Sequence, residues 1–479
     1  MKLTSRHSYY PASAVIAILL LMACPILSSA TTPSPASKSA DGIYDILDYG
    51  AVGDGRTDST PAIQSAINAA SVKGGIVLVP VGRFLCKGHL ELKMGVHLKG
   101  LNEVPQSWEP QTGSILLPTE GRDNEDGPAF IEMRSSSSLT GVTIYYPEQN
   151  VDDIRPYPWT IQVRGNPSHP QEVSFDTTVA DVTLINSYNG IRTGPTENGR
   201  HRIMSVHGCV LRRGILIDWT GDIGRLENIQ FHCHFWANKA FHGDFGKAFD
   251  YMQHNLEAFV FGRTDWEYVT NTFVFPAKIG YRFIETPNGA ANGQFSGIGA
   301  DATENAVLVE AIQHMGLLIT NGEFDSHLSG VSTQVIVEKQ SRGNVRFVNS
   351  AFWGPVKHNA VLRGDGFTSF SDCYFSNDNP TSEAAILVEG GKVQIQNSTF
   401  AAVAKRLVAG HGPPEGGVQF QPPSIHLTPG VQSAIIRGNN GYYGVNIENE
   451  IGGRAIISDN EPFHAFSRAS SNEPHPSTP

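Results

Sequence analysis

A short hydrophobic–polar phrase recurs nine times between Leu184 and Phe400. In each copy an apolar residue is followed, two places later, by a small or amide residue and usually by another apolar residue three places further on. The small or amide members are Asn186, Gly208, Cys233, Asn271, Gly297, Asn321, Asn349, Asp372 and Asn397. Seven of the eight intervals between them are 22 to 28 residues long, and weaker copies occur at Gly141, Gly438 and Asp459.

A period of twenty-odd residues built from short alternating apolar runs is typical of one turn of a stacked β-coil, and is too short for paired-helix repeats. Segments 345–349 and 393–397 alternate as strands do, with every second side chain pointing inward. We therefore predict an all-β fold, a parallel β-helix that runs from about residue 75 to residue 462. Stacked equivalent strands would place phenylalanines over one another inside and asparagines at the bends, where Asn tolerates a left-handed backbone.

The interval from Cys233 to Asn271 is 38 residues long, which predicts an insertion of about a dozen residues in one turn. Insertions of this kind usually build one side of a binding surface. This one concentrates ionisable side chains and tryptophans, namely Trp236, His242, Asp244, Lys247, Asp250, His254, Glu257, Arg263, Asp265, Trp266 and Glu267. Because carboxylates handle protons and indole rings stack on sugars, this composition suits a site that binds and cleaves a glycan.

Asp265 and Glu267 are the first candidates for a catalytic carboxylate pair, followed by Asp244 and His242. In an extended strand Asp265 and Glu267 share a face with Cα atoms about 6.6 Å apart, close to the separations that glycosidases use. One would protonate the leaving oxygen while the other activates water or attacks the sugar. The alternative is structural: counting back from Asn271 places Glu267 in an inward column, where it would need a partner such as Arg263.

Substrate contacts are expected from Trp236, Arg263, Arg225, His232 and His234. The two histidines lie two apart on a strand, which is also a spacing of metal ligands, but no third ligand follows at a diagnostic offset, so we predict no metal site. Arginine suits an acidic sugar, although an exposed arginine is often only a solvated surface residue. A lyase would need a base such as His and a group that neutralises a uronate, often Ca²⁺ or Arg, so the residue types leave elimination open.

The N-terminal part contains a second informative phrase. From Asp48 the chain reads DYGAVGDGRTDSTPAIQSAINAASVKGGIVLVPVGRF. A glycine-rich turn precedes a helix that Asp58 or Thr57 can cap and that has Pro61 in its first turn. The apolar residues of this helix fall on one face, so it would cover the open end of the coil, and Asp54 and Asp58 are assigned structural roles.

This phrase resembles the start of proteins in the pectate lyase superfamily, in the group of rhamnogalacturonase-like and epimerase-like proteins related to glycoside hydrolase family 28. The resemblance is close over residues 44–100 and continues beyond them as a pattern. It implies a right-handed parallel β-helix that acts on polysaccharides, in a family of hydrolases, lyases, epimerases and phage tailspikes. The sequence lacks the Asn-Thr-Asp strand end and paired aspartates of true polygalacturonases, so the resemblance does not identify a pectin-cleaving activity.

The two ends of the chain differ in composition from the repeat. Residues 1–30 combine Lys2 and Arg6 with an apolar stretch that ends in small residues, which predicts an export signal and a secreted or periplasmic protein. Lipoprotein processing at Cys24 is the alternative. We expect a disordered linker over 31–41, a capping helix and first turns over 42–100, the β-helix over 101–462 and a disordered tail over 463–479. No other stretch is long and apolar enough to span a membrane.

The formal charge is −11, from 46 acidic and 35 basic side chains. This balance argues against nucleic acid as a partner and, more weakly, against a polyanionic substrate, although a local basic groove can override net charge. The cysteines include no CxxC pair and do not indicate a disulfide framework. We therefore expect an exported glycoside hydrolase that acts on a polysaccharide without a cofactor. A polysaccharide lyase, with Ca²⁺, and a non-catalytic glycan-binding β-helix are the alternatives.

Overall fold

The computed structural model describes residues 41–105, 112–166, 172–326, 332–377, 383–401, 423–442 and 444–463. The chain divides into two compact units, Met1–Lys38 and Ser39–Pro479, and all the described residues belong to the second. The predicted export signal with Cys24, the linker up to residue 40 and the tail beyond Phe463 lie outside the described residues. No helix within these residues is long and apolar enough to cross a bilayer.

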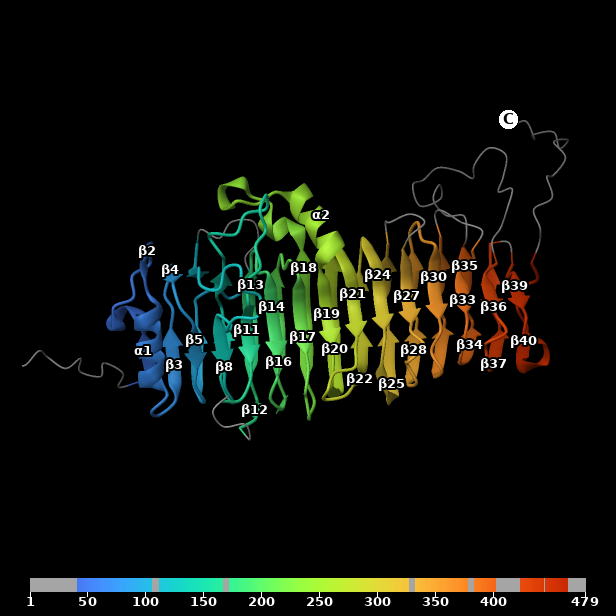
Figure 1. Cartoon of the computed structure of the whole chain (residues 1–479), viewed down its shortest axis with the longest axis horizontal. Helices are drawn as coiled ribbons and strands as arrows, with labels where there is room; N and C mark the ends of the chain where they lie inside the picture. The colour runs from blue at the N-terminus through green and yellow to red at the C-terminus, as the bar shows by residue number, and fades with distance from the viewer. Residues whose placement is uncertain are drawn as a thin grey trace, which may run out of the picture. The chain divides into compact units, whose positions relative to one another are not determined.

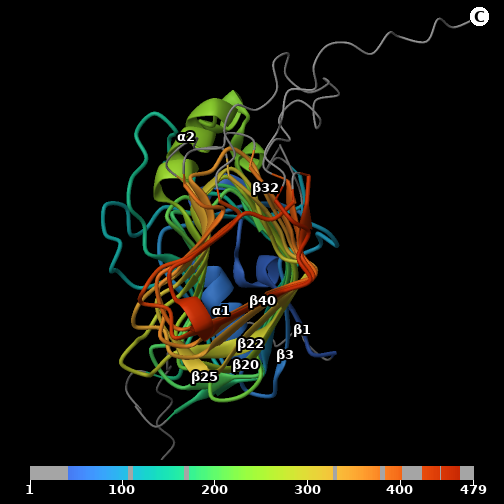
Figure 2. The same ribbon diagram turned by 90° about the vertical axis from the view of Figure 1, so that its right-hand side faces the viewer.

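The second unit is a parallel β-helix, as the repeat predicts (Figure 1). Each coil contributes to a 13-stranded sheet and to a 25-stranded sheet, and successive coils pair in parallel. The 25-stranded sheet turns a corner, so that its strands form two ladders, here called the first and the second ladder (Figure 2).

The 13-stranded sheet contains β5 (Leu90–Leu92), β8 (Ile131–Met133), β11 (Trp159–Val163), β14 (Asn189–Thr193), β17 (Arg213–Ile217), β19 (Glu257–Phe261), β21 (Ala277–Phe283), β24 (Thr303–Val309), β27 (Thr333–Val337), β30 (His358–Leu362), β33 (Ile386–Val388), β36 (Ile425–Leu427) and β39 (Ile447–Asn449). A separate pair consists of β12 (Ser174–Phe175) and β15 (Asn198–Gly199).

The first ladder contains β1 (Ile43–Asp45), β3 (Gly75–Leu78), β6 (Val96–Lys99), β9 (Ser138–Thr140), β13 (Thr178–Leu184), β16 (Arg202–Gly208), β18 (Arg225–His232), β20 (Thr264–Phe275), β22 (Ala291–Ser296), β25 (Ile312–Thr320), β28 (Asn344–Val348), β31 (Phe367–Ser371), β34 (Lys392–Gln396), β37 (Ser433–Arg437) and β40 (Ala455–Ser458). The second ladder contains β2 (Asp54–Asp58), β4 (Gly82–Cys86), β7 (Ser114–Pro118), β10 (Thr143–Ile144), β23 (Gly299–Ala300), β26 (Glu323–Asp325), β29 (Ala351–Trp353), β32 (Tyr374–Ser376), β35 (Thr399–Ala401) and β38 (Asn440–Gly441). Strands β13, β16, β18 and β20 run around the corner and belong to both ladders.

The corner is formed by one residue per coil in a left-handed conformation. These residues have φ between 49° and 66° and are Gly141, Asp181, Ser205, Asn228, Asn271, Gly297, Asn321, Asn349, Asp372, Asn397, Gly438 and Asp459. From Asn271 onwards they are the residues of the predicted column, so this part of the prediction is confirmed. In three earlier turns the prediction is wrong by three to five positions, because the corner lies at Asp181, Ser205 and Asn228.

The interior is filled by side chains that stack from coil to coil. The ring centroids of Phe347 and Phe370 are 5.0 Å apart, and Phe375 stacks on Phe400 at 5.0 Å. At the corner, the side-chain amide of Asn349 donates to Oδ1 of Asn321 at 2.8 Å. The internal phenylalanine stacks and the asparagines at the left-handed corner were predicted, and both are confirmed.

Helix α1 (Thr60–Ala70) covers the N-terminal coils with its apolar face, because Ile63, Ala66, Ile67 and Ala70 are fully buried. The carboxylate of Asp58 accepts a hydrogen bond from the backbone N–H of Thr60 at 3.0 Å, as expected of a side chain at a helix start. Asp54 accepts from two backbone N–H groups of its own turn at 2.8 Å. The structural roles predicted for Asp54 and Asp58 are confirmed.

The predicted insertion lies between β18 and β19 and is longer than expected, because the corner-to-corner interval from Asn228 to Asn271 is 43 residues. It contains the 3-10 helices η2 (Cys233–Trp236) and η3 (Lys239–Phe241) and the helix α2 (Phe245–Asn255). Helix α2 lies where the second ladder meets the 13-stranded sheet, at the top of both views (Figures 1 and 2). The remaining 3-10 helices are η1 (Ile46–Tyr49) and η4 (Gly452–Arg454).

Candidate functional site

The predicted site residues fall into two groups at opposite ends of β18 and β20. Arg225 begins β18 and His232 ends it, and the corner residue Asn228 lies between them, so the two residues belong to different ladders. Asp265 and Glu267 lie near the start of β20, just before Tyr268, which pairs with Arg225 at the start of β18. The insertion follows the opposite end of β18. The residues that the sequence joins into one site therefore belong to two separate surfaces.

Glu267 is not available to a ligand. Its side chain is fully buried, its Oε1 lies 2.9 Å from Nε2 of His201, and its Oε2 accepts from Oγ1 of Thr264 at 2.7 Å. His201 is itself buried, with 1% of its surface exposed. Glu267 and His201 therefore form a buried contact between coils. The prediction that Arg263 is the partner of Glu267 is wrong.

Asp265 points elsewhere, since 37% of its side chain is exposed and it forms an ion pair with Arg263. Its Oδ1 also accepts from Nε2 of Gln313 at 2.9 Å, and this bonding holds the pKa of Asp265 below its usual value despite partial burial. Trp266 between the two acids has a left-handed backbone, with φ of 58°, and interrupts the strand alternation. The prediction that Asp265 and Glu267 share one face is therefore wrong.

The insertion residues build the insertion itself. Trp236 is 1% exposed and its Nε1 donates to the carbonyl oxygen of Phe241 at 2.8 Å, so its ring offers no face to a sugar. Asp244 accepts from the backbone N–H of Lys247 at 3.2 Å at the start of α2. His242 ends η3 in a left-handed conformation and its side chain is exposed. Trp236 and Asp244 therefore stabilise the insertion, a structural role that the sequence did not indicate.

A different set of side chains lines up on the outer face of the second ladder beside α2. His232 pairs in register with Phe275, and Asp325 pairs with Trp353. Asp301 follows Ala300 and Asp325 follows Phe324, and because those two neighbours pair in register and are fully buried, Asp301 and Asp325 lie on the outward side. We call His232, Phe275, Asp301, Asp325 and Trp353 the second-ladder column.

The two carboxylates of this column come from consecutive coils. Parallel neighbours in register have Cα atoms about 4.8 Å apart, so the backbones of Asp301 and Asp325 lie side by side. In retaining glycosidases the two carboxyl groups are about 5–5.5 Å apart. Asp301 is half-buried, whereas Asp325 is 1% exposed. The fold therefore places two acidic residues next to each other on consecutive coils of this face.

Aromatic and imidazole rings flank the two acids. His232 lies 4.7 Å from Phe275 and 4.0 Å from His234, measured between ring centroids. Beyond the acids, the indole N–H of Trp353 donates to Glu323 at 3.0 Å, which fixes the ring plane. Rings held in this way on one face suit contact with the apolar faces of sugars.

The imidazoles beside α2 are held in their neutral form. Burial, together with the neighbouring His234, lowers the pKa of His232 from 6.5 to about 4, and nearby Asp301 opposes this shift. Burial also lowers the pKa of His234 and of His207. Nδ1 of His232 accepts from the backbone N–H of His234 at 3.1 Å, so its Nε2 carries the proton.

We expect the free energy of unfolding to decrease as the pH is lowered from about 6.5 to about 4. In this window the unfolded chain binds a proton at residue 232 and the folded chain does not, so lowering the pH favours unfolding. Urea midpoints at pH 7 and pH 5 measure the effect. The fall should be smaller in His232→Asn and unchanged in His314→Asn, whose imidazole is exposed. Equal falls in all three proteins would contradict the assignment.

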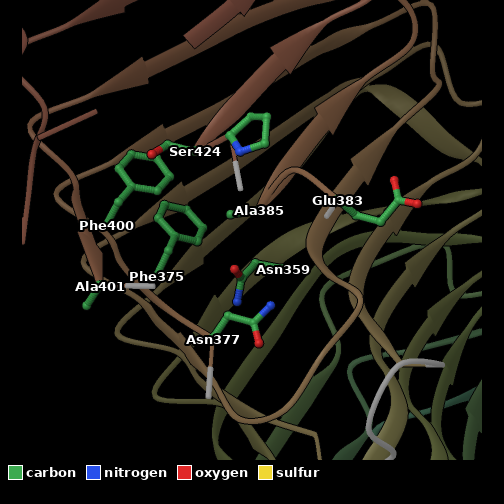
Figure 3. A pocket seen from close by; sticks show the side chains of 9 residues that line it. Asn359, Phe375, Asn377, Glu383, Ala385, Phe400, Ala401 and Ser424 are labelled. Carbon is green, nitrogen blue, oxygen red and sulfur yellow. The ribbon is translucent and has the colours of Figure 1, made fainter. Parts of the chain in front are cut away.

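Two hollows elsewhere are poorer candidates. The first, between the end of the second ladder and the 13-stranded sheet, has a volume of about 10 Å³ and is lined by residues such as Asn359, Phe375 and Phe400 (Figure 3). It has room for about one water molecule. The second, of about 590 Å³, lies beside α1, where Arg134 already binds Glu91, Glu132 and two carbonyl oxygens.

No group of three or more His, Cys, Asp or Glu side chains that could hold a metal ion occurs in the described part of the chain. The four cysteines within it, Cys86, Cys209, Cys233 and Cys373, are buried and free.

The sequence prediction did not include Asp301 and Asp325, because it took its candidate residues from the insertion. Each lies four places after a corner residue, Gly297 or Asn321, so the same offset in consecutive repeats was a readable signal. Side chains that meet in a β-helix are usually one period apart in sequence and not one or two residues apart.

Comparison with known proteins agrees with the fold. Residues 43–114 match the family model described as "Rhamnogalacturonase A/epimerase, pectate lyase-like", so the resemblance seen in the N-terminal phrase is confirmed. The chain is 43% identical over 67 residues to mannuronan C5-epimerase AlgE3 of Azotobacter vinelandii, which covers 12% of this chain and 4% of that protein.

Plasmin and fibronectin-binding protein A of Streptococcus pneumoniae is 48% identical over 160 residues, covering 33% of this chain and 20% of that protein. The chain therefore spans only a small part of the length of either relative. Among solved structures, the N-terminal fragment of bacteriophage Phi29 gene product 12 matches with a TM-score of 0.54 and 12% identity, over 88% of this chain and 73% of that one. This likeness supports the β-helix fold alone.

Proposed function

We propose, starting from the family match over residues 43–114, that this protein is an exported glycoside hydrolase whose substrate lies on the second ladder beside α2. The observation that supports the proposal is the pair Asp301 and Asp325 on consecutive coils. One carboxyl group would protonate the leaving oxygen while the other attacks the sugar or activates water. Phe275 and Trp353 would contact sugar rings on either side of the pair.

Two alternatives make use of the same surface. A lyase needs a base, and neutral His234 could take a proton from a uronate carbon, because burial lowers its pKa and keeps it unprotonated. A non-catalytic glycan-binding protein needs only the rings and hydrogen-bonding groups. Because Asp325 is 1% exposed, hydrolysis requires that its carboxyl group becomes accessible when the substrate binds, whereas glycan binding does not.

Incubation with a panel of polysaccharides, followed by mass analysis of the products, separates the three functions. Hydrolysis releases new reducing ends with the mass of one added water and no absorbance near 235 nm. An unsaturated product that absorbs near 235 nm would show elimination and would reject the hydrolase. Binding of a polysaccharide without any change in its mass would reject both enzymes and support the glycan-binding protein.

A further inference from the structure

Two arginines are stacked in register on the outer face of the first ladder. Arg202 on β16 pairs with Arg225 on β18, and Arg225 pairs with Tyr268 on β20. Both arginines are exposed, and neither has an ion-pair partner among the described residues. Asp176, whose pKa is lowered mainly by its hydrogen bond to Arg200 and slightly by the charge of Arg202, is bound by Arg200 at 2.7 Å. Like charges directly opposite each other on neighbouring strands are destabilising, so this arrangement requires an explanation.

Aromatic rings continue the same face on the next coil. Tyr268 is 36% exposed and Trp266, two residues before it, is 57% exposed. Trp266 is held in a left-handed conformation that bulky residues avoid, with φ of 58°. Its backbone N–H donates to Oδ1 of Asn292 at 2.9 Å, and the carboxylate of Asp265 beside it is fixed by Arg263 and Gln313.

These polar contacts stabilise a turn that leaves the indole ring of Trp266 exposed to solvent. Backbone strain of this kind clusters at functional sites. Trp266 is two residues from Tyr268, which pairs with Arg225 on the first ladder. In Figure 2 the first-ladder strands β20 and β22 lie at the bottom of the coil, away from α2 at the top. This surface is distinct from the second-ladder column.

We propose that Arg202, Arg225, Trp266 and Tyr268 form a binding site for an anionic saccharide chain. The planar guanidinium groups bind carboxylate or sulfate oxygens in a bidentate manner, and the indole and phenol rings stack on the sugar faces. An anion between the two guanidinium groups removes their repulsion. The proposal goes beyond the proposed function, because this site binds a glycan without reacting with it and does not require the second-ladder acids.

The net charge of −11 does not oppose this assignment, since binding depends on the local field and not on the total charge. Sequence analysis had already named Arg225 as a contact for an acidic sugar. The structure adds Arg202, which the sequence places 23 residues earlier, at the same position of the preceding coil.

Affinity electrophoresis of the full chain tests the proposal, in gels that contain polygalacturonate, dextran sulfate or neutral dextran. We expect retardation by a carboxylated or a sulfated polymer and none by dextran, and the two polymers distinguish the acid group. The double variant Arg202→Ala/Arg225→Ala should weaken binding at least tenfold. Trp266→Gly, which keeps the left-handed backbone and loses the ring, should weaken it by about tenfold.

The matched control is Arg346→Ala/Arg437→Ala, which removes two exposed arginines from other coils of the first ladder and should change binding less than twofold. Equal losses in the control, or no retardation of the wild type, would overturn the proposal. Equal retardation by DNA would overturn the saccharide assignment. The arginine variants leave Asp301 and Asp325 unchanged, so their loss of retardation is independent of the catalytic proposal. Circular dichroism excludes unfolded variants.

Discussion

Replacing Asp301 by asparagine is expected to lower kcat on the cleaved polysaccharide by about 10²–10⁴-fold, the usual contribution of general acid–base catalysis. Asparagine keeps the size and most hydrogen bonds of the side chain but cannot transfer a proton. KM should change little, because in the proposed site Phe275 and Trp353 would still contact the sugar. Initial rates measured by reducing-end release, over a range of substrate concentrations, separate the effects on kcat and KM.

Asp325→Asn is the companion variant, and it separates catalysis from structure. If both carboxyl groups act on the substrate, the double variant should lose little more activity than either single variant, because residues that act as a unit are not additive. Glu227→Gln is the matched control, since Glu227 is an exposed acid on the first ladder and should keep full activity. Full turnover in Asp301→Asn would remove the pair from the mechanism.

The fold could be predicted from the sequence because each coil of a β-helix needs the same kinds of residue at the same positions, so the requirement recurs at a fixed interval. Apolar residues at the stacked inward positions and Asn at the left-handed corner each specify the same coil, as at Phe347 and Asn349. The register failed in the coils before Asn271, because the phrase fits two places there. Val179 with Asp181 matches it as well as Leu184 with Asn186 does. Because the prediction used Leu184 with Asn186, it made the predicted insertion too short and shifted the predicted register of these coils.

The candidate site was harder to predict because its members meet by stacking. Asp301 and Asp325 are 24 residues apart in sequence, whereas Asp265 and Glu267 are two apart and were chosen for that reason. The alternation rule that placed the second pair on one face assumes an unbroken strand. The left-handed residue Trp266 breaks it, and register with β22 shifts at the same place. No local pattern shows that a tryptophan adopts this conformation.

The structural alternative that sequence analysis left open for Glu267 leads to the second large effect. Glu267→Ala is expected to destabilise the protein by about 3–5 kcal/mol, as loss of one partner from a buried pair does. The change leaves Nε2 of His201 and Oγ1 of Thr264 without their carboxylate in a site that solvent does not reach. Gly224 lies directly against the side chains of His201 and Glu267, so the pair is enclosed from this side as well.

Urea unfolding followed by tryptophan fluorescence measures this loss, with Glu227→Ala as a control that should lie within about 0.5 kcal/mol of the wild type. The same preparations distinguish the structural role from the catalytic one that the sequence suggested. At a temperature where Glu267→Ala remains folded, its kcat on the cleaved polysaccharide should stay within a few-fold of the wild type. A variant of wild-type stability that has lost its turnover would contradict this assignment and return Glu267 to the reaction.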